Sequence, residues 1–331
     1  MTPIVVAFTL ALLLQPLVVA TMRHARIIDI PNGRSSHDNP TPRGGGLAVV
    51  TGMLVGLTIA GGMPLFLTTA VLTFAAIGLG EDLRGLTVQA RLTMQLVAGA
   101  VTGFLLLQGL AQPAWALMLG VMGGGLWVAA YANVFNFMDG VNGISAAHGI
   151  VGGLAYTAIG HWLNSPMLQV GGAVLAASAA AFLPWNAWRP LIFLGDVGSY
   201  GLGAGLATLG LGAVANGVPP EAALGPLALY LADTSWTLLR RLRAGEPILR
   251  PHRSHVYQRL NVAGWSHVRI AATTAGLATV VSGAGFASLT GDIALRFACD
   301  GAAAALLVGY LGLPELLGRR AHRPVPLIMS P

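Results

Sequence analysis

Residues 2–22 read TPIVVAFTLALLLQPLVVATM and contain no charged side chain, and Arg23 and Arg26 follow them directly. About 20 apolar residues are enough to span the hydrocarbon core of a bilayer as an α-helix. In a secretory signal peptide the positive charge comes before the apolar segment, and a cleavage site follows it. The order is reversed here, so we expect an uncleaved first helix with its N-terminus outside.

Further apolar runs follow the first, separated by polar stretches or by short turns such as Gly61-Gly62-Met63-Pro64 and Pro219-Pro220. The sequence therefore predicts an all-α, polytopic integral membrane protein with about 11 transmembrane helices. These helices are expected to form one membrane domain over residues 1–331. The further runs are 44–61, 63–80, 92–110, 115–134, 146–163, 167–184, 200–216, 221–239, 270–289 and 293–314.

The overall composition supports a membrane protein. Of the 331 residues, 55% are hydrophobic and 9% are charged, whereas charged residues make up about 25% of a typical soluble domain. So few charges cannot cover the surface of a water-soluble fold of this size. A soluble enzyme, a disordered tail and a nucleic-acid-binding module are therefore excluded.

The basic residues predict the orientation. All 18 are arginine, and if the runs cross alternately, 17 of them fall on one face, with Arg296 as the exception. The positive-inside rule makes that face cytoplasmic, with the C-terminus on the same side. Any phosphate clamp must then be a guanidinium, which stays charged and binds in bidentate fashion. We expect the active-site loops within 22–46, 81–91, 135–145, 185–199 and 240–269.

Two acidic motifs lie on this face. Glu81 and Asp82 follow the third run, and adjacent carboxylates near a bilayer are costly unless a cation lies close to them. A divalent ion or a clamping arginine would supply that charge, and a plain helix cap is the alternative. Asp196 lies between two glycines in FLGDVGS, residues 193–199. A single aspartate suits a Mg²⁺ ion whose other ligands are water and substrate phosphates.

A third motif is amide-rich. Residues 133–143 read NVFNFMDGVNG. If this stretch is helical, Asn136, Asp139 and Asn142 are three residues apart and share one face. There they could read the hydrogen-bonding edge of a base or a sugar. A polar, helix-breaking turn is the alternative.

Two basic strings complete the set. Residues 251–260, PHRSHVYQRL, interleave histidine and arginine with a tyrosine, which suits a pyrophosphate and its base. A loop that attracts anionic lipid is the alternative. Arg43 precedes three glycines and could hold a phosphate at a helix start, with a flexible linker as the alternative.

Together these strings, including PTPRGGG at 40–46, resemble the polyprenyl-phosphate N-acetylhexosamine-1-phosphate transferases over about residues 25–265. That family includes the phospho-MurNAc-pentapeptide translocase and the GlcNAc-1-phosphate transferases. The resemblance implies a multi-helix membrane enzyme with a cytoplasmic site. It also implies the reaction, in which a sugar-1-phosphate passes from a UDP-N-acetylated sugar to undecaprenyl phosphate and UMP is released.

The resemblance implies roles for individual residues. Glu81 and Asp82 match the paired acids near the polyprenyl phosphate, and Asp196 matches the ligand of Mg²⁺, which Mn²⁺ could replace. We favour Asp82 as the base, although a two-step route through an aspartyl intermediate also fits. The other matches are Phe193 and Gly195 beside the nucleoside pocket, Asn136, Asp139 and Asn142 on the nucleotide, and His255 as the first histidine of the cytoplasmic motif. Candidate phosphate clamps are Arg43, Arg84 and Arg253.

Two positions depart from the family pattern. Glu81 stands where aspartate is usual, and Tyr257-Gln258 replaces the later histidine pair. The second departure places the chain nearer the branch that begins O-antigen chains with UDP-FucNAc or UDP-QuiNAc. The expected location is the bacterial inner membrane, with the active site facing the cytoplasm. The expected partners are the UDP-sugar, undecaprenyl phosphate and membrane lipid, without nucleic acid, and a homodimer is compatible with the sequence.

Two other functional classes are alternatives to the enzyme. A transporter or lipid flippase would place polar residues near mid-membrane and often contains inverted repeats. Here the polar residues gather at one interface, with Asp233 as the main exception, which we interpret as structural or as a residue that holds a site residue in place. A non-catalytic scaffold would not need the acidic set intact. The sequence therefore favours the enzyme.

Overall fold

The computed structural model describes residues 1–31, 39–108, 113–247 and 252–321. Within them, helices occupy all the predicted apolar runs, and 8 helices are long and apolar enough to cross a membrane. The prediction of a polytopic, helical membrane protein is thus confirmed. The eight are α1 (Thr2–His24), α3 (Leu65–Arg84), α4 (Val88–Leu107), α5 (Ala114–Phe137), α7 (Pro166–Asn186), α8 (Gly195–Ala215), α12 (His267–Ala287, continued by the 3-10 turn η2, Ser288–Thr290) and α13 (Ile293–Ala321).

The remaining elements are shorter or less apolar. Run 221–239 is divided by the 3-10 turn η1 (Gly225–Leu227), because Pro226 has no backbone N–H to donate inside a continuous helix. The two short strands pair in antiparallel fashion, with Ile28 opposite Pro42. The elements are α2 (Gly46–Ile59), α6 (Ile144–Trp162), α9 (Pro220–Leu224), α10 (Ala228–Arg243), α11 (Val256–Val262), β1 (Ile28–Asp29) and β2 (Thr41–Pro42).

Two helix ends differ from the predicted boundaries in a way that matters for the site. The third run extends through Arg84, so Glu81 and Asp82 lie in the last turn of α3. The run predicted from residue 200 begins at Gly195, so Asp196 lies in the first turn of α8. Hydropathy marks only where apolar residues start and stop, and polar residues at helix ends escape it. These acids are therefore held on helices and not on loops.

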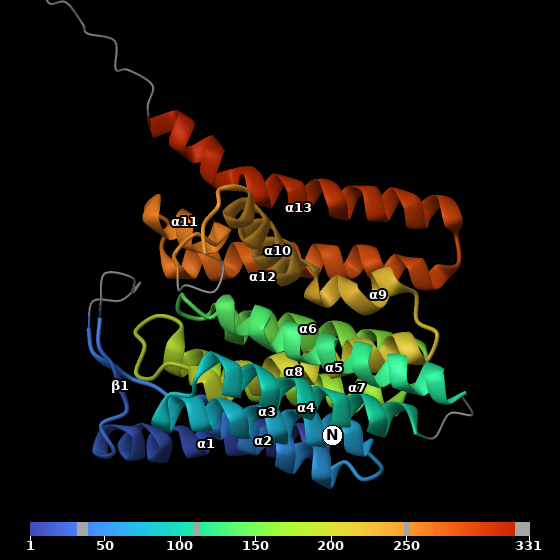
Figure 1. Cartoon of the computed structure of the whole chain (residues 1–331), viewed down its shortest axis with the longest axis horizontal. Coiled ribbons are helices and arrows are strands. Elements are labelled where there is room, and N and C mark those ends of the chain that lie inside the picture. The colour runs from blue at the N-terminus through green and yellow to red at the C-terminus, as the bar shows by residue number, and fades with distance from the viewer. Residues whose placement is uncertain (32–38, 109–112, 248–251, 322–331) are drawn as a thin grey trace, which may run out of the picture.

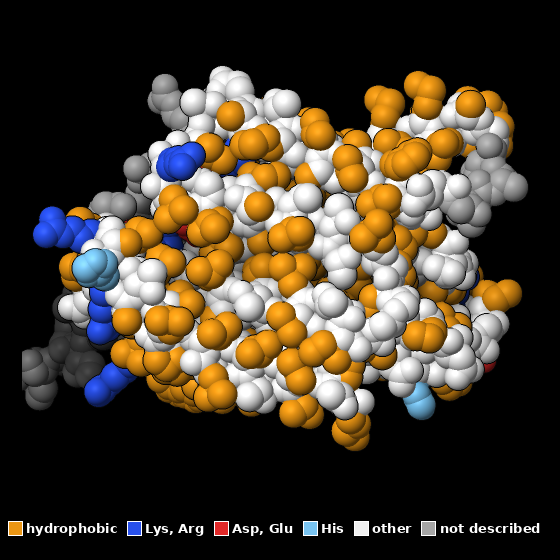
Figure 2. Space-filling view, turned by 90° about the horizontal axis from the view of Figure 1, so that it is seen from below, with side chains coloured by type: hydrophobic (Ala, Val, Ile, Leu, Met, Phe, Trp, Pro, Cys, Tyr) orange, Lys and Arg blue, Asp and Glu red, His pale blue; other side chains and the backbone are white. Residues whose placement is uncertain are grey.

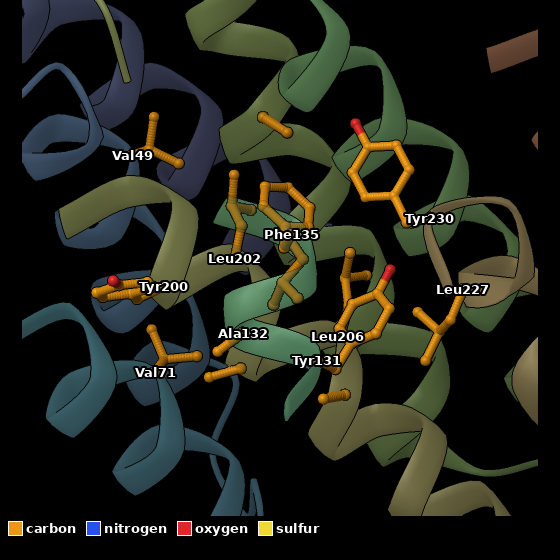
Figure 3. Close-up of a cluster of buried hydrophobic side chains, with 14 of the residues drawn as sticks. Val49, Val71, Tyr131, Ala132, Phe135, Tyr200, Leu202, Leu206, Leu227 and Tyr230 are labelled. Carbon is orange, nitrogen blue, oxygen red and sulfur yellow. The ribbon is translucent and has the colours of Figure 1, made fainter. Parts of the chain in front are cut away.

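Helix α8 lies at the centre of the bundle. Its most apolar window is 89% buried, and it packs against α2, α3 and α5. In Figure 3, Tyr200 and Leu202 of α8 form one buried cluster with Val71 of α3 and Phe135 of α5. Every one of these side chains is at most 1% exposed. The first turn of α8, which carries Asp196, is therefore anchored by a rigid core.

The helices run roughly side by side along the long axis of the molecule, with α12 and α13 at one edge and α1 to α4 at the opposite edge (Figure 1). Figure 2 shows hydrophobic side chains over the long body and arginine side chains gathered at one end. The same end carries β1 and α11 in Figure 1. We call it the polar end and define it by residues 25–31, 39–45, 85–87, 138–143, 187–194, 244–247 and 252–255.

Candidate active site

Asp82 connects α3 to the start of α8. Its Oδ1 accepts a hydrogen bond from the backbone N–H of Asp196 at 3.1 Å, and its Oδ2 accepts one from Val197 at 2.9 Å. The first N–H groups of a helix have no partner inside it, and the helix dipole favours an anion there. The Nε of Arg43 adds an ion pair at 2.9 Å, and the Asp82 side chain is only 2% exposed. Asp82 therefore caps α8 and holds Arg43.

The glycine-rich strings allow the backbones to meet at this point. The N–H groups of Gly44 and Gly45 donate to the carbonyl of Phe193, which joins the two strings by hydrogen bonds. A Cβ on Gly46 would lie 2.1 Å from the Cα of Gly198, well inside van der Waals contact. PRGGG is therefore a close-packing motif that brings Arg43 beside α8, and the flexible-linker alternative is wrong.

Asp196 is held from the side by α5. The Asn136 amide donates to Asp196 Oδ1 at 2.8 Å and to the Ser199 hydroxyl at 2.9 Å. Within the described ranges, no three His, Cys, Asp or Glu side chains are arranged to hold a metal ion by themselves. Mg²⁺ commonly binds through one or two carboxylates while keeping water and substrate phosphates. Asp196 fits that mode of binding, with Asn136 fixing its orientation.

Glu81 lies beside Asp82 but has different partners. Its Oε2 accepts the backbone N–H of Leu86 at 2.7 Å, and Arg91 Nη1 lies 3.6 Å from its Oε1. The Glu81 and Arg91 side chains are 17% and 20% exposed. Glu81 is therefore the more accessible acid of the pair, with a guanidinium from α4 next to it.

The amide-rich motif does not form one helix face. Helix α5 ends at Phe137, and residues 138–143 form a turn before α6. Gly143 has φ +79°, and its N–H donates to Asn186 at 2.6 Å. A left-handed residue ends regular helix geometry. The shared-face prediction for Asn136, Asp139 and Asn142 is thus wrong, and the turn alternative is confirmed.

Within this turn, Asp139 is close to the acids of α3 and α8. Burial raises the pKa of Asp139 to about 7, and the carboxylates of Asp196 and Asp82 add to the increase. The backbone N–H of Asn142 donates to His267 at the start of α12, at 3.3 Å. The turn therefore contributes Asp139 to the acidic cluster and connects to the second half of the bundle through Asn142.

The histidine string lies on the other side of the turn. The ring of His255 is 6.2 Å from that of Phe137, and Tyr257 donates its hydroxyl proton to the carbonyl of Phe137 at 2.9 Å. The side-chain amide oxygen of Gln258 accepts the N–H of His255 at 3.3 Å. Burial and the neighbouring His255 lower the pKa of His252 to about 4. Tyr257 and Gln258, which replace the family's histidines, thus fix the start of α11.

Comparisons with known proteins identify the family. Residues 64–213 match the glycosyl transferase family 4 model. A decaprenyl-phosphate N-acetylglucosaminephosphotransferase of Mycobacterium leprae is 30% identical over 292 residues, covering 72% of this chain and 71% of the relative. The chain belongs to glycosyl transferase family 4.

Two further relatives have related names. A probable undecaprenyl-phosphate N-acetylglucosaminyl 1-phosphate transferase of Bacillus subtilis is 28% identical over 81% of this chain and 80% of the relative. A phospho-N-acetylmuramoyl-pentapeptide-transferase of Synechococcus sp. (strain JA-3-3Ab) is 31% identical over 77% and 82%. The resemblance inferred from the sequence motifs is therefore confirmed.

The structure brings the predicted residues of this family 4 member to the polar end or to the helix turns next to it. Arg84 is exposed at the end of α3, and Arg91 is the arginine that lies beside Glu81. Arg253 is half-buried in the segment before α11. Residues gathered around the first turn of α8 are Arg43, Glu81, Asp82, Asn136, Phe193, Gly195 and Asp196, with Asp139 in electrostatic range.

Sequence reasoning missed three residues of the site. Arg91 is the last residue of the predicted loop 81–91, ten residues from Glu81, and the turn at Gly85 brings the two together. Ser199 received no role from the sequence, yet its hydroxyl accepts a hydrogen bond from Asn136. For Asp233, interpreted as structural or as a residue that holds a site residue in place, the sequence did not reveal that its partner is His255. No local spacing reveals any of these contacts.

Proposed function

We propose that this protein transfers a sugar-1-phosphate from a UDP-N-acetylated hexosamine to undecaprenyl phosphate and releases UMP. The observation that carries the proposal is the meeting of Asp82, Asn136 and Arg43 around Asp196 at the start of α8. Phosphoryl transfer needs mainly positioning and neutralisation of charge. A rigid helix end with several acids and arginines supplies both.

The charge of the cluster favours a divalent cation. Glu81, Asp82, Asp139 and Asp196 contribute four carboxylates, and among the described residues Arg43 and Arg91 pair with two of them as counter-charges. We propose that Asp196 holds Mg²⁺, with Mn²⁺ able to replace it. When bound, the ion would offset the negative charge that develops on the leaving UMP.

The acceptor phosphate is proposed to bind at Glu81. An oxygen of the lipid phosphate would attack the β-phosphorus of the UDP-sugar, and the bond from that phosphorus to UMP would break. Arg91 would hold the lipid phosphate. Because Asp82 already accepts hydrogen bonds from α8 and pairs with Arg43, Glu81 is better placed to orient or deprotonate the lipid phosphate.

The donor nucleotide is proposed to lie between the 138–143 turn and the 252–257 segment. Phe193 and Gly195, at the start of α8, are proposed to border this region, and the backbone N–H of Asn142 is held by His267. Arg43 and Arg253 are the candidate clamps for the diphosphate. Half-buried Asp139, with its pKa raised to about 7 by burial, is a suitable partner for a base or sugar donor group.

The membrane topology is part of the proposal. We infer eleven crossings of a bacterial inner membrane, in which α2, α6 and the broken α9–η1–α10 segment join the eight longer helices. The N-terminus would be outside, and the polar end would face the cytoplasm, where nucleotide sugars are found. The gathering of arginine at that end supports this orientation (Figure 2).

The sugar is proposed to be a 6-deoxy-N-acetylhexosamine that begins an O-antigen chain, as the departures at Tyr257 and Gln258 indicate. The test is purified protein in detergent, with undecaprenyl phosphate, Mg²⁺ and a panel of UDP-N-acetylated sugars, following UMP release. UMP formed only when the lipid phosphate is present is the expected result. Folded protein that releases no UMP from any donor would contradict the enzyme and favour a transporter or a scaffold.

A further inference from the structure

Asp233 is a buried acid that the proposed reaction does not use. It lies on α10 and is 0% exposed. Its Oδ1 lies 3.1 Å from His255 Nδ1, 3.0 Å from the N–H of Val256 and 3.3 Å from the Thr237 hydroxyl. Its Oδ2 lies 3.2 Å from the N–H of Tyr257 and 2.7 Å from the Tyr310 hydroxyl. Donors from α10, α13 and the start of α11 therefore converge on one carboxylate.

These contacts define which nitrogen of His255 carries a proton. A backbone N–H can only donate, so both oxygens of Asp233 act as acceptors toward α11. Because a carboxylate oxygen accepts, we assign the donor role in this contact, and with it a proton, to His255 Nδ1, which lies 3.1 Å from Oδ1. When Nδ1 of a histidine is fixed in this way, its other ring nitrogen, Nε2, is left for chemistry.

His255 lies close to the part of the site that is proposed to bind the donor, which indicates a ligand for Nε2. The ring of His255 lies beside that of Phe137. Phe137 directly follows Asn136, whose amide donates a hydrogen bond to Asp196. Tyr257 is bonded to the carbonyl of Phe137, and a Cβ on Gly140 would lie 2.1 Å from the Tyr257 hydroxyl. The segment that Asp233 holds is therefore packed directly against the proposed donor-binding turn.

We propose that Asp233 is a positioning residue of the transfer site. It holds His255 with a proton on Nδ1 and directs Nε2 toward the diphosphate of the sugar nucleotide. It also fixes the start of α11, so that the ring cannot turn away. Tyr310 carries this support to α13, the outermost helix. This inference rests on the proposed function, because the ligand of Nε2 is the donor substrate of that reaction.

The activity test is a double-mutant cycle. Asp233→Asn should lower kcat/KM for UMP release by roughly 10- to 100-fold, as for other carboxylates that orient a functional histidine. In the His255→Ala background the same substitution should change it by no more than about twofold, since Asp233 acts through His255. An equal loss in both backgrounds would mean a purely structural role and would overturn the proposal.

Tyr310→Phe is the matched control. It removes a hydrogen bond from the same carboxylate but leaves the contact with His255. It should keep kcat/KM within about twofold of the wild type, in keeping with the modest net worth of one neutral hydrogen bond. A loss as large as that of Asp233→Asn would show that any disturbance of the buried carboxylate is harmful, and would overturn the assignment to His255.

A second measurement does not need a variant of Asp233 to fold and does not need activity. In protein labelled with ¹⁵N-histidine, the His255 signals are assigned by their loss in His255→Gln. A protonated Nδ1 is the expected result, and a bare Nδ1 would overturn the proposal. Wild-type protein with the protonated Nδ1 but no UMP release with any donor would instead contradict the proposed function.

Discussion

Helices α8 and α13 are almost equally apolar, with mean hydropathy 1.3 and 1.5 in their most apolar windows, yet 89% of the first window and 6% of the second are buried. Hydropathy measures the preference for an apolar medium, and protein interior and lipid both satisfy it. The two helices differ in burial because small residues let the backbone of α8 approach its neighbours closely, as small residues do between helices in a membrane. A Cβ on Gly203 of α8 would lie 2.8 Å from Phe135, whereas Gly309 of α13 has nothing within 4 Å.

The comparison also separates the two helices by chemistry. The first turn of α8 receives Asp82 from α3 and Asn136 from α5, which makes it the meeting point of the proposed site. Helix α13 contributes a hydrogen bond from Tyr310 to Asp233 and, through Glu315, an ion pair with Arg259 of α11. A helix at the centre of the bundle can bring an acid into contact with several neighbouring helices. A peripheral helix can only stabilise residues of the site from one side.

The largest expected effect is at the start of α8. Asp196→Asn should lower Mg²⁺-dependent UMP release by at least about 100-fold, since a group that stabilises charge in the transition state is lost. Asp300→Asn on α13 is the matched control and should stay within about twofold. Both are measured by UMP release during a Mg²⁺ titration of folded protein. Near-normal turnover in Asp196→Asn would end the metal assignment.

The next effect concerns packing. Gly198→Ala on α8 places a methyl group 2.6 Å from the Cα of Gly46, and such overpacking costs about 1–3 kcal/mol. Gly309→Ala on α13 meets no neighbour and should change the free energy of unfolding by less than about 0.5 kcal/mol. Thermal unfolding in detergent measures both. Equal shifts in Tm would contradict the explanation by close backbone approach.

A smaller effect separates two arginines. Arg91 lies beside Glu81 near α8, whereas Arg84 is exposed. Arg91→Ala should raise KM for undecaprenyl phosphate about tenfold, the loss of one charge-assisted contact, with little change in KM for the UDP-sugar. Arg84→Ala should change either KM by less than about twofold. The reverse ranking would return the acceptor clamp to Arg84.

The smallest effect is in the pH dependence of stability. Burial raises the pKa of Asp139 from 3.8 to about 7 in the folded protein. Between these values the folded state holds a proton that the unfolded state has released. The contribution of Asp139 to the free energy of unfolding is therefore complete below pH 4 and is lost as the pH rises through 7. Asp139→Asn should remove that fall, about 1–3 °C in Tm, whereas Asp300→Asn should keep it. A wild-type slope in Asp139→Asn would contradict the shift.

Particular residues show how far sequence reasoning reached. The runs of apolar residues predicted where the helices lie, and the motifs around Arg43, Asn136 and Asp196 predicted which residues gather and which family they belong to. Spacing failed for Asn136, Asp139 and Asn142, because Gly143 adopts φ +79° and the helix has already ended at Phe137. Sequence reasoning also favoured Asp82 over Glu81 as the base, because the hydrogen bonds that occupy Asp82 come from residues more than 100 positions away and leave no local signal.

The sequence by itself determined the class of protein, because transfer of apolar segments into a membrane depends on composition and length alone. It also determined the family, because the motifs are short strings of fixed residues. Only the tertiary structure decided the arrangement of the site: Asp82 as the cap of α8, Arg91 beside Glu81, and Asp233 behind His255. Each of these is a contact between separate helices, and its energy depends on distances that no local pattern contains.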